Sequence, residues 1–319
     1  MIYLNEKDLF TIGLNWKEFT ETIREGVRCL NQGESVQPIK PYLRFKDIKN
    51  RIIAMPAYLG NDFDVAGIKW IASFPDNIKK NKARANCVTI LNHADTGEPI
   101  CIINTQLISV LRTTTVSRLM IEEYCSLKKI QNPKIGIIGF GPIGKYHLAM
   151  CQDYFKDDHA EFFIYDLNGV RPEDIDMYDN VTVVDDWYSA YKDADVFMTC
   201  TVSNERYIDK KPKENSLHLN VSLRDYKTEQ LDYFKDGIIV DKWKEICREN
   251  TDIEAMHKER NLVETDVKSI EDVVINKCLK DMVDKTAILF NPMGMAIFDI
   301  ALGHYFYNKS KELKVGAVL

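Results

Sequence analysis

A strand–turn–helix sequence in the middle of the chain constrains its fold more than any other feature. Lys134–Gly139 is a short, Ile-rich apolar run, which is typical of a strand buried on both faces of a parallel sheet. Gly139, Gly141 and Gly144 follow with G-x-G-x-x-G spacing, and a helical pattern begins near Pro142. The first glycine allows a tight turn, the second lets a pyrophosphate approach the backbone, and the third lets helix and strand pack closely. A plain turn without a ligand is the alternative, but the context favours a dinucleotide site.

The residues around this turn favour NAD as the dinucleotide. The helix that begins with Pro142 and Ile143 presents the free N–H groups of its first turn, to which the proline contributes none, and a positive dipole end to phosphates. A second short strand, Glu161–Tyr165, ends on Asp166. A carboxylate there can accept hydrogen bonds from both ribose hydroxyls and repels a 2′-phosphate, so we expect NAD and not NADP. The separation from Gly139 to Asp166 is longer than the usual ~20 residues.

Composition narrows the classes of partner. The 319 residues are enough for two domains, and a net charge of −6 without a basic tract argues against nucleic acid and against an anionic membrane surface. No apolar run approaches the ~18 residues of a membrane span, and the N-terminus does not resemble a signal peptide. The eight cysteines contain no C-x-x-C pair, and the six histidines show no metal spacing. We therefore expect a cytoplasmic protein with reduced thiols, without a metal, that acts on a small molecule.

The first part of the chain predicts an α+β domain. Trp16–Asn31 has the apolar spacing of an amphipathic helix that ends near Gly33. Short β-rich segments separated by turn clusters follow, and this spacing favours a mostly antiparallel sheet with attached helices over βαβ units. The expected strands are Pro41–Phe45, Arg51–Met55, Asp64–Ser73, Cys87–Leu91 and Pro99–Asn104.

The second part predicts a doubly wound parallel sheet. Thr105–Tyr124 is expected to be a long helix, broken near Arg112–Thr115, that leads into this domain. Strands and helices then alternate. A charged stretch, 250–284, is interpreted as helical surface, and a final helix, Gly294–Lys314, could return to the first domain. We thus expect an α/β protein with a discontinuous domain, 1–112 and 292–319, around a dinucleotide-binding domain, 113–291. The expected strands are Lys134–Gly139, Glu161–Tyr165, Val181–Val184, Asp195–Thr201, Ser216–Val221, Gly237–Asp241 and Ile288–Asn291.

Two cationic residues could carry chemistry. Lys69 lies within an apolar β-pattern, where a lysine usually extends to solvent, and the sequence alone favours that interpretation. A functional lysine there would present its ammonium to a carboxylate or exchange protons. Arg112 precedes three threonines, starting with Thr113, and hydroxyls and free N–H groups at a helix start beside an arginine would make an anion site. A surface arginine beside an N-cap threonine is an equal alternative.

Other candidates lie at strand ends. Cys200, Thr201 and Ser203 follow the fourth parallel strand, where such folds place ligands at the carboxyl edge of the sheet. Asn291–Gly294, at the start of the last helix, could offer backbone donors to an anion. His147, on the helix after the glycines, is interpreted as a helix-surface residue and not as a catalyst.

Five segments together resemble the ornithine cyclodeaminase and mu-crystallin superfamily, over essentially the whole chain. They are RIIAMPAYLG (51–60), GIKWIASFPDN (67–77), TGEPICIINTQLISVLRTTTVS (96–117), IGFGPIGKYH (138–147) and NPMGMAIFDIA (291–301). With QPIKPYLR (37–44), the first, second and last look most like one subgroup, the N-(2-amino-2-carboxyethyl)-L-glutamate dehydrogenases, which make 2,3-diaminopropionate for siderophores and peptide antibiotics. The resemblance implies a homodimer with a substrate and dimerisation domain built from both chain ends, joined to an NAD-binding Rossmann domain.

The resemblance also implies roles for single residues. Lys69 and Arg112 would be catalytic and contact the substrate, and Arg112 would also reach the cofactor region. The family's upstream basic residue could be either Lys40 or Arg44. The remaining implied substrate contacts are Met55 and Gly294, and the implied cofactor contacts are Thr113, Gly139, Gly141, Pro142, Ile143, Gly144, Asp166, Cys200, Thr201, Ser203 and Met293.

One departure bears on the reaction. Cyclodeaminases carry an Asp in a loop after the fifth Rossmann strand, and anchoring on Lys227 and Glu229 places Leu223 at that position, with Asp225 two residues away. Ornithine cyclisation is therefore disfavoured. The preferred hypothesis is oxidation of the secondary amine of a dicarboxylic amino-acid conjugate, with Lys69 handling the proton. The alternatives are an alanine dehydrogenase, a cyclic ketimine reductase, or a dinucleotide-binding protein without catalysis.

Overall fold

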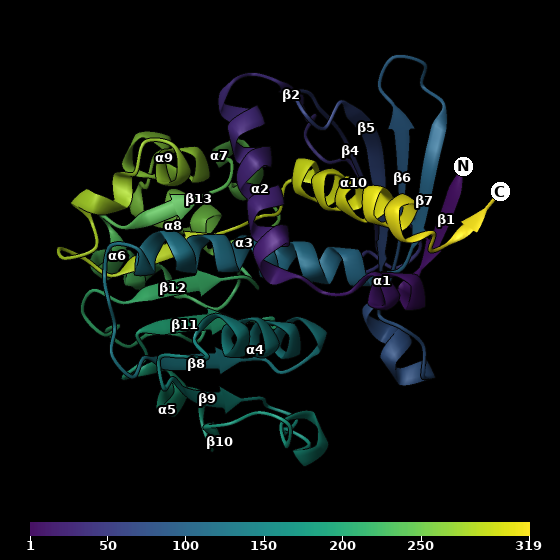
Figure 1. Ribbon diagram of the computed structural model, residues 1–319. Coiled ribbons are helices and arrows are strands. Elements are labelled where there is room, and N and C mark those ends of the chain that lie inside the picture. Colours follow the sequence, from purple (N-terminus) through teal and green to yellow (C-terminus); the bar gives the residue numbers. More distant parts are fainter. The chain divides into compact units, whose positions relative to one another are not determined.

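Two sheets, each in its own compact unit, organise the chain. The computed structural model describes residues 1–319 and divides into Met1–Arg112 with Gly294–Leu319, and Thr113–Met293 (Figure 1). The predicted α/β fold class, with one mostly antiparallel and one parallel sheet, is confirmed. No helix combines the length and apolarity that crossing a bilayer would require.

The first unit contains a mostly antiparallel sheet. All of its strand pairs are antiparallel except β1 with β7. Burial alternates along its strands, so that Cys87, Thr89 and Leu91 of β6 point to the covered face. In sheet order the strands are β16 (Ala317–Val318), β1 (Ile2–Asn5), β7 (Pro99–Asn104), β6 (Ala85–His93), β5 (Val65–Ser73), β4 (Arg51–Leu59) and β2 (Ser35–Val36), with β3 (Tyr42–Arg44) also pairing β4.

Two long helices cover one face of this sheet. Figure 1 shows α10 (Ala296–Leu313, yellow) lying across β4, β5 and β6, and α2 (Trp16–Asn31) packs against α10. Gly26 of α2 leaves room for the ring of Phe298, which would lie 3.5 Å from an added Cβ. A short helix, α1 (Glu6–Ile12), is capped by Asn5. Most of the first eight residues of α10 are apolar and all are buried, so its packing positions whatever polar group it carries.

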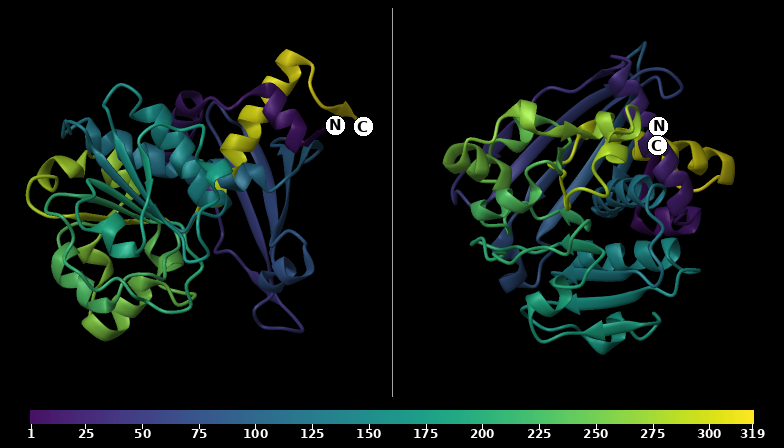
Figure 2. Two further views of the ribbon diagram at one scale, coloured as in Figure 1. Left: turned by 90° about the horizontal axis from the view of Figure 1, so that it is seen from below. Right: turned by 90° about the vertical axis from the view of Figure 1, so that its left-hand side faces the viewer.

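The second unit contains a parallel sheet with helices on both faces (Figure 2). In sheet order its strands are β10 (Val181–Val183), β9 (Glu161–Tyr165), β8 (Lys134–Ile138), β11 (Val196–Thr199), β12 (Leu217–Asn220), β15 (Ile288–Asn291), β13 (Ile238–Val240) and β14 (Lys268–Ser269). The order reverses between β8 and β11, which is where doubly wound sheets bind ligands. The helices are α4 (Pro142–Tyr154), α5 (Trp187–Tyr191), α6 (Leu231–Phe234), α7 (Trp243–Ile246), α8 (Asp252–Arg260) and α9 (Ile270–Val274).

Three expectations about elements are wrong. The predicted break at Arg112–Thr115 does not occur, because α3 (Leu107–Cys125) runs through it with Thr114 and Thr115 fully buried. The stretch 250–284 is not simply helical surface, since it also contains β14 and the buried Asp252. His147 is not on the surface: it is buried in α4, where its Nε2 lies 2.8 Å from Ser117 Oγ of α3. Burial lowers the pKa of His147 to about 4, so its ring is neutral.

Candidate active site

A buried cluster of charges lies between the sheet of the first unit and α10. Lys69 of β5 is 1% exposed, and its Nζ donates to Asp299 Oδ1 of α10 at 2.8 Å and to Ser109 Oγ at 3.3 Å. Arg112 Nε donates to the same Asp299 oxygen at 3.0 Å. The interpretation of Lys69 as a solvent-facing lysine is therefore wrong, because its alternation along β5 directs it to the face that α10 covers.

Asp299 is the residue that sequence reasoning missed. It is fully buried and holds both cations through one oxygen, while its Oδ2 has no hydrogen-bond partner. Two positive groups face one carboxylate, so the cluster retains an excess positive charge and an acceptor that is not saturated. Buried polar groups in folded proteins are usually paired, and an exception of this kind points to a ligand site. The signal in the sequence was a single acid within the apolar run of 295–303.

The cluster prepares Lys69 to exchange a proton near neutral pH. Burial lowers the pKa of Lys69 to about 8, although the charge of Asp299 opposes this change, and the neighbouring Arg112 lowers it further. An amine with such a pKa is present in both protonation states at physiological pH. It can therefore act as a base or an acid toward a bound molecule.

Gly294 connects Arg112 to the start of α10. Its backbone has φ +88°, and a Cβ there would lie 2.7 Å from Arg112 Nη1, so a side chain would displace the guanidinium. The Gly294 carbonyl accepts a hydrogen bond of 2.7 Å from Lys40 Nζ, which is buried. Arg44 is exposed and donates to the Ile48 carbonyl. Of the two competing basic residues, Lys40 is thus the one that lies beside the cluster.

Met55 lies on the same face of the sheet as Lys69. Thr113, by contrast with the expectation, does not form part of an anion site at a helix start. Met55 pairs with Lys69 across β4 and β5 and is 4% exposed. Thr113 lies within α3, six positions after Leu107, where backbone N–H groups are bonded within the helix. The prediction that Arg112–Thr115 offers free backbone N–H donors at a helix start is therefore wrong. What Arg112 offers is its guanidinium.

The glycine turn of the second unit has the space that a pyrophosphate needs. A Cβ at Gly139 would meet the Cys200 backbone and one at Gly144 would collide with the Gly139 carbonyl, whereas one at Gly141 would meet nothing within 4 Å. The first and third glycines are thus required by the fold, and the second leaves open space. Gly141 is also the N-cap of α4, and no side chain caps this helix, whose first residues are Pro142 and Ile143. The turn therefore fits an anion held by backbone N–H groups.

Asp166 lies at the end of β9 beside this turn. Its Oδ2 accepts a hydrogen bond of 2.6 Å from Phe140 N, within the glycine turn, and its Oδ1 accepts one of 2.8 Å from Asn168 N. The carboxylate therefore already orders the turn. Each oxygen keeps acceptor capacity for a further donor, such as a sugar hydroxyl.

The residues at the carboxyl edge of β11 have internal partners. The Thr201 hydroxyl donates to Asp225, and Ser203 Oγ donates to the Glu205 carbonyl at 2.5 Å. Cys200 is half-buried, and burial raises the pKa of its thiol well above the usual value, so it is not a nucleophile at neutral pH. Met293 is half-buried and packs against the apolar core of the second unit.

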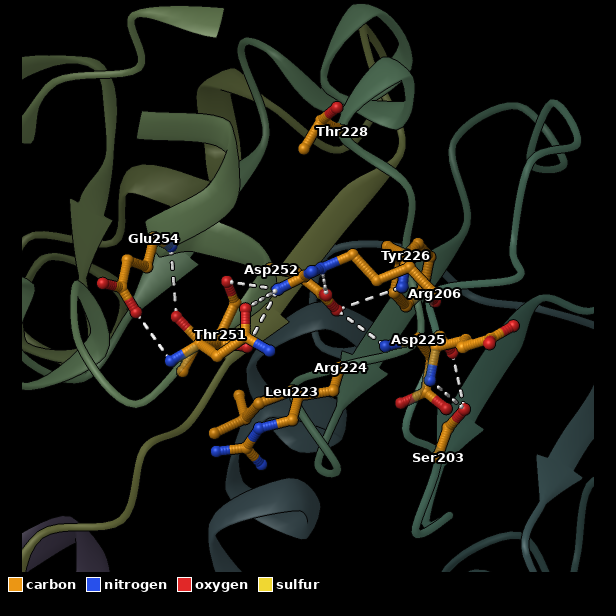
Figure 3. A network of polar contacts seen from close by, with 12 residues as sticks. Ser203, Arg206, Leu223, Arg224, Asp225, Tyr226, Thr228, Thr251, Asp252 and Glu254 are labelled. Atoms are coloured by element: carbon orange, nitrogen blue, oxygen red, sulfur yellow. Dashed lines mark hydrogen bonds and ion pairs between the residues drawn. The ribbon is translucent and has the colours of Figure 1, made fainter. Parts of the chain in front are cut away.

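A saturated network holds the loop after β12 (Figure 3). Arg206 Nε donates to Asp252 Oδ1 at 2.7 Å, and Asp252 Oδ2 accepts from the backbone N–H groups of Asp225 at 2.9 Å and Tyr226 at 3.0 Å. Burial raises the pKa of Asp252 to about 6 against these donors. Leu223 adopts φ +68° in this loop and is 6% exposed. Asp225 is fully buried and accepts from the hydroxyl of Ser222 as well as Thr201, so it is occupied within the fold.

Comparison with known proteins places this site in a family. The model of the ornithine cyclodeaminase/mu-crystallin family matches residues 9–314. The N-((2S)-2-amino-2-carboxyethyl)-L-glutamate dehydrogenase of Staphylococcus aureus is 32% identical over 100% of this chain and 98% of its own. Alanine dehydrogenase of Archaeoglobus fulgidus is 26% identical over 95% of this chain and 94% of its own. The solved structure of Δ1-pyrroline-2-carboxylate reductase of Thermococcus litoralis, with NADH and L-proline, shares the fold with a TM-score of 0.85 at 22% identity over the whole of both chains. The protein therefore belongs to the ornithine cyclodeaminase/mu-crystallin family.

Proposed function

We propose that this protein is an NAD-dependent dehydrogenase that oxidises the secondary amine of N-(2-amino-2-carboxyethyl)-L-glutamate. The products are 2-oxoglutarate and 2,3-diaminopropionate, of use in building siderophores or peptide antibiotics. The observation that carries the proposal is the Lys69–Arg112–Asp299 cluster, which is buried, has excess positive charge and suits a carboxylate. The full-length similarity to a dehydrogenase of this substrate supports the choice within the amino-acid oxidoreductases.

The chemistry needs a hydride acceptor and a base. NAD, when bound, accepts the hydride that leaves the glutamate Cα. Arg112 and Lys40 bind the neighbouring carboxylate and orient the C–H bond, and this positioning lowers the barrier. Neutral Lys69 takes the proton that the amine nitrogen loses as the carbon–nitrogen double bond forms. Water then adds to the imine carbon, and cleavage of the carbon–nitrogen bond releases the keto acid and the diamino acid.

The cofactor is held by the glycine turn. Gly141 and the N-terminus of α4 receive the pyrophosphate, and Asp166 accepts hydrogen bonds from the adenosine ribose. The carboxylate of Asp166 disfavours a 2′-phosphate, and NAD is thus the cofactor of the reaction.

The functional unit is a homodimer formed through the first unit. The face of the sheet opposite Lys69 carries Ala54, Trp70 and Val88 side by side, and Trp70 is 42% exposed. An apolar row of this kind is suited to pairing with a second copy. Light scattering after size exclusion should give twice the chain mass, and Trp70→Glu should shift it toward the monomer.

The experiment that tests the reaction is incubation with N-(2-amino-2-carboxyethyl)-L-glutamate and NAD. NADH absorbance at 340 nm should rise, with 2-oxoglutarate and 2,3-diaminopropionate formed in equal amounts. Alanine, proline, cyclic ketimines with NADH, and ornithine form the comparison panel. Faster turnover of any of these would replace the proposed substrate, and NADH binding without any turnover would indicate a non-catalytic protein. Cyclisation of ornithine is not expected, since Leu223 occupies the position of the cyclodeaminase carboxylate and Asp225 is buried.

A further inference from the structure

A second group of cationic side chains lies on the sheet of the first unit, away from Asp299. Arg44 of β3 and Arg51 of β4 are directly opposite each other, and both guanidinium groups lie against the ring of Tyr42, at 5.4 and 5.6 Å from its centre. Arg84, just before β6, is close enough for its pKa to be lowered by burial and then by the charge of Arg51. Like charges directly opposite in a sheet are destabilising, so the fold alone does not account for this arrangement.

Two of these arginines are half-buried, and each has a buried nitrogen without the partner that such a donor normally has. Arg51 Nε and Arg84 Nε are inaccessible to water and form no hydrogen bond. Neither residue forms an ion pair with a carboxylate, in contrast to Arg112, which pairs with one, and Arg118, which pairs with two. A guanidinium binds a carboxylate through paired N–H donors, so the two arginines have the donors and the charge for an anionic group.

The register of the strands places Arg51, with its neighbours Arg44 and Tyr42 on β3, on the same face as Lys69. Met55 pairs with Lys69, and Arg51 follows the same alternation four residues earlier on β4. The row between them contains Ile53, which pairs with Tyr42. At ~3.3 Å per residue, Arg51 and Met55 are about 13 Å apart along β4. The Arg51 guanidinium lies against the ring of Tyr42, the residue opposite Ile53, and so extends part of the way toward Met55 and Lys69. A molecule with a carboxylate at each end of a short carbon chain can therefore reach both.

We infer that Arg51 and Arg84, beside Arg44 and Tyr42, form a second carboxylate subsite that binds the side-chain carboxylate of a dicarboxylic substrate. This inference deepens the proposed function and rests on it for the placing of the reacting end at Lys69 and Arg112. The subsite selects glutamate-derived over alanine-derived or proline-derived compounds, because a ligand without the second carboxylate leaves buried arginine donors unpaired. Arg51 and Arg84 are thus specificity residues and do not touch the reacting atoms.

Binding of two keto acids tests this subsite without requiring turnover. Isothermal titration of the NAD-loaded protein with 2-oxoglutarate and with 2-oxobutyrate, which lacks the distal carboxylate, should give at least about 10-fold tighter binding of 2-oxoglutarate. Arg51→Gln and Arg84→Gln should each reduce this preference to near unity while 2-oxobutyrate affinity stays unchanged. Lys82→Gln removes the same charge from an exposed position and should leave the preference intact. Thermal melting checks that each variant folds, and Arg51→Gln should not lower the melting temperature, since it relieves repulsion.

The outcomes separate the subsite from the reaction. Equal affinity of the wild type for the two keto acids, or an undiminished preference in both arginine variants, would overturn the subsite even if the enzyme turns over the proposed substrate. No turnover of N-(2-amino-2-carboxyethyl)-L-glutamate together with an arginine-dependent preference for 2-oxoglutarate would reject the proposed reaction and support the subsite for another dicarboxylic compound.

Discussion

Two fully buried aspartates, one in each unit, are held in different ways. Asp252 accepts from Arg206, from two backbone N–H groups and from the Asn220 amide, so that both of its oxygens are bonded. Asp299 holds Lys69 and Arg112 through one oxygen and leaves the other without a partner. Both oxygens of Asp252 are thus used within the fold, whereas the Asp299 cluster keeps an excess positive charge and one carboxylate oxygen without a hydrogen bond.

The difference separates stability from function. A saturated buried network fixes a loop, and removing one member leaves the others unpaired. An unsaturated cluster with excess positive charge stabilises the fold less than a saturated network does, and it gains stability when it binds an anion. We therefore expect substitutions around Asp252 to change the free energy of unfolding and substitutions around Asp299 to change turnover.

The largest expected effect is that of Lys69→Ala on turnover. Loss of the proton-exchanging amine should lower kcat by about 10²- to 10⁴-fold, while NAD affinity measured by protein fluorescence stays near the wild-type value. Lys49→Ala, an exposed lysine on the same unit, serves as control and should keep full activity. A Lys69→Ala variant as active as the wild type would remove Lys69 from the mechanism.

Asp252→Ala should act on folding instead. It removes the carboxylate partner of Arg206 Nε and leaves the N–H groups of Asp225 and Tyr226 without an acceptor. Because Arg206 is partly exposed and keeps its hydrogen bonds to Asn250 and Thr251, the loss should be about 3 kcal/mol, at the lower end for a buried pair. Urea unfolding followed by circular dichroism measures it. Asp232→Ala breaks only an exposed ion pair with Arg260 and should change the unfolding free energy little. If Asp252→Ala kept the unfolding free energy of the wild type but lost turnover, Asp252 would have a functional role and not the stabilising one assigned to it here.

The same distinction can be tested inside the glycine turn. Gly141→Ala adds a methyl group where the protein has open space, so it should leave the melting temperature near normal and weaken NAD binding by about 10-fold through its clash with the phosphates. Gly144→Ala would collide with the Gly139 carbonyl and should destabilise the fold. If Gly141→Ala bound NAD normally, the pyrophosphate would not lie along this turn.

The smallest expected effect is a shift of the pH profile. In the proposed mechanism Lys69 is the neutral base, and its pKa is about 8, so kcat/KM for oxidation should rise with pH through about 8 and then level off. The charge of Asp299 raises the pKa of Lys69, so Asp299→Asn should move this rise to lower pH. A rise that stays in place in Asp299→Asn, or that persists in Lys69→Ala, would assign it to another group.

The sequence predicted what depends on local pattern. The spacing of Gly139, Gly141 and Gly144 after an apolar run is a local signal, and β8 and α4 lie on either side of the turn as expected. The break in α3 was wrong because burial of Thr114 and Thr115 against the protein outweighs the low helix propensity of a threonine run.

The candidate site was predicted in part. Lys69 and Arg112 were named, but the partner that joins them lies 230 and 187 residues away in sequence, and no local pattern contains such a pairing. The burial of Lys69 also followed from α10, whose packing on β5 the strand alternation alone could not reveal. Long-range contacts of this kind are decided by tertiary packing and not by propensity.

The contribution of α10 to the charge cluster has a consequence for how the protein is made. On the ribosome, Lys69 and Arg112 emerge early, and Asp299, the carboxylate that pairs with both, is translated only after the entire second unit. Domains tend to form as their residues become available, so the nascent first unit has to hold two uncompensated positive charges until the final helix docks. We therefore expect the charge cluster, the proposed substrate site, to be completed last, after the second unit.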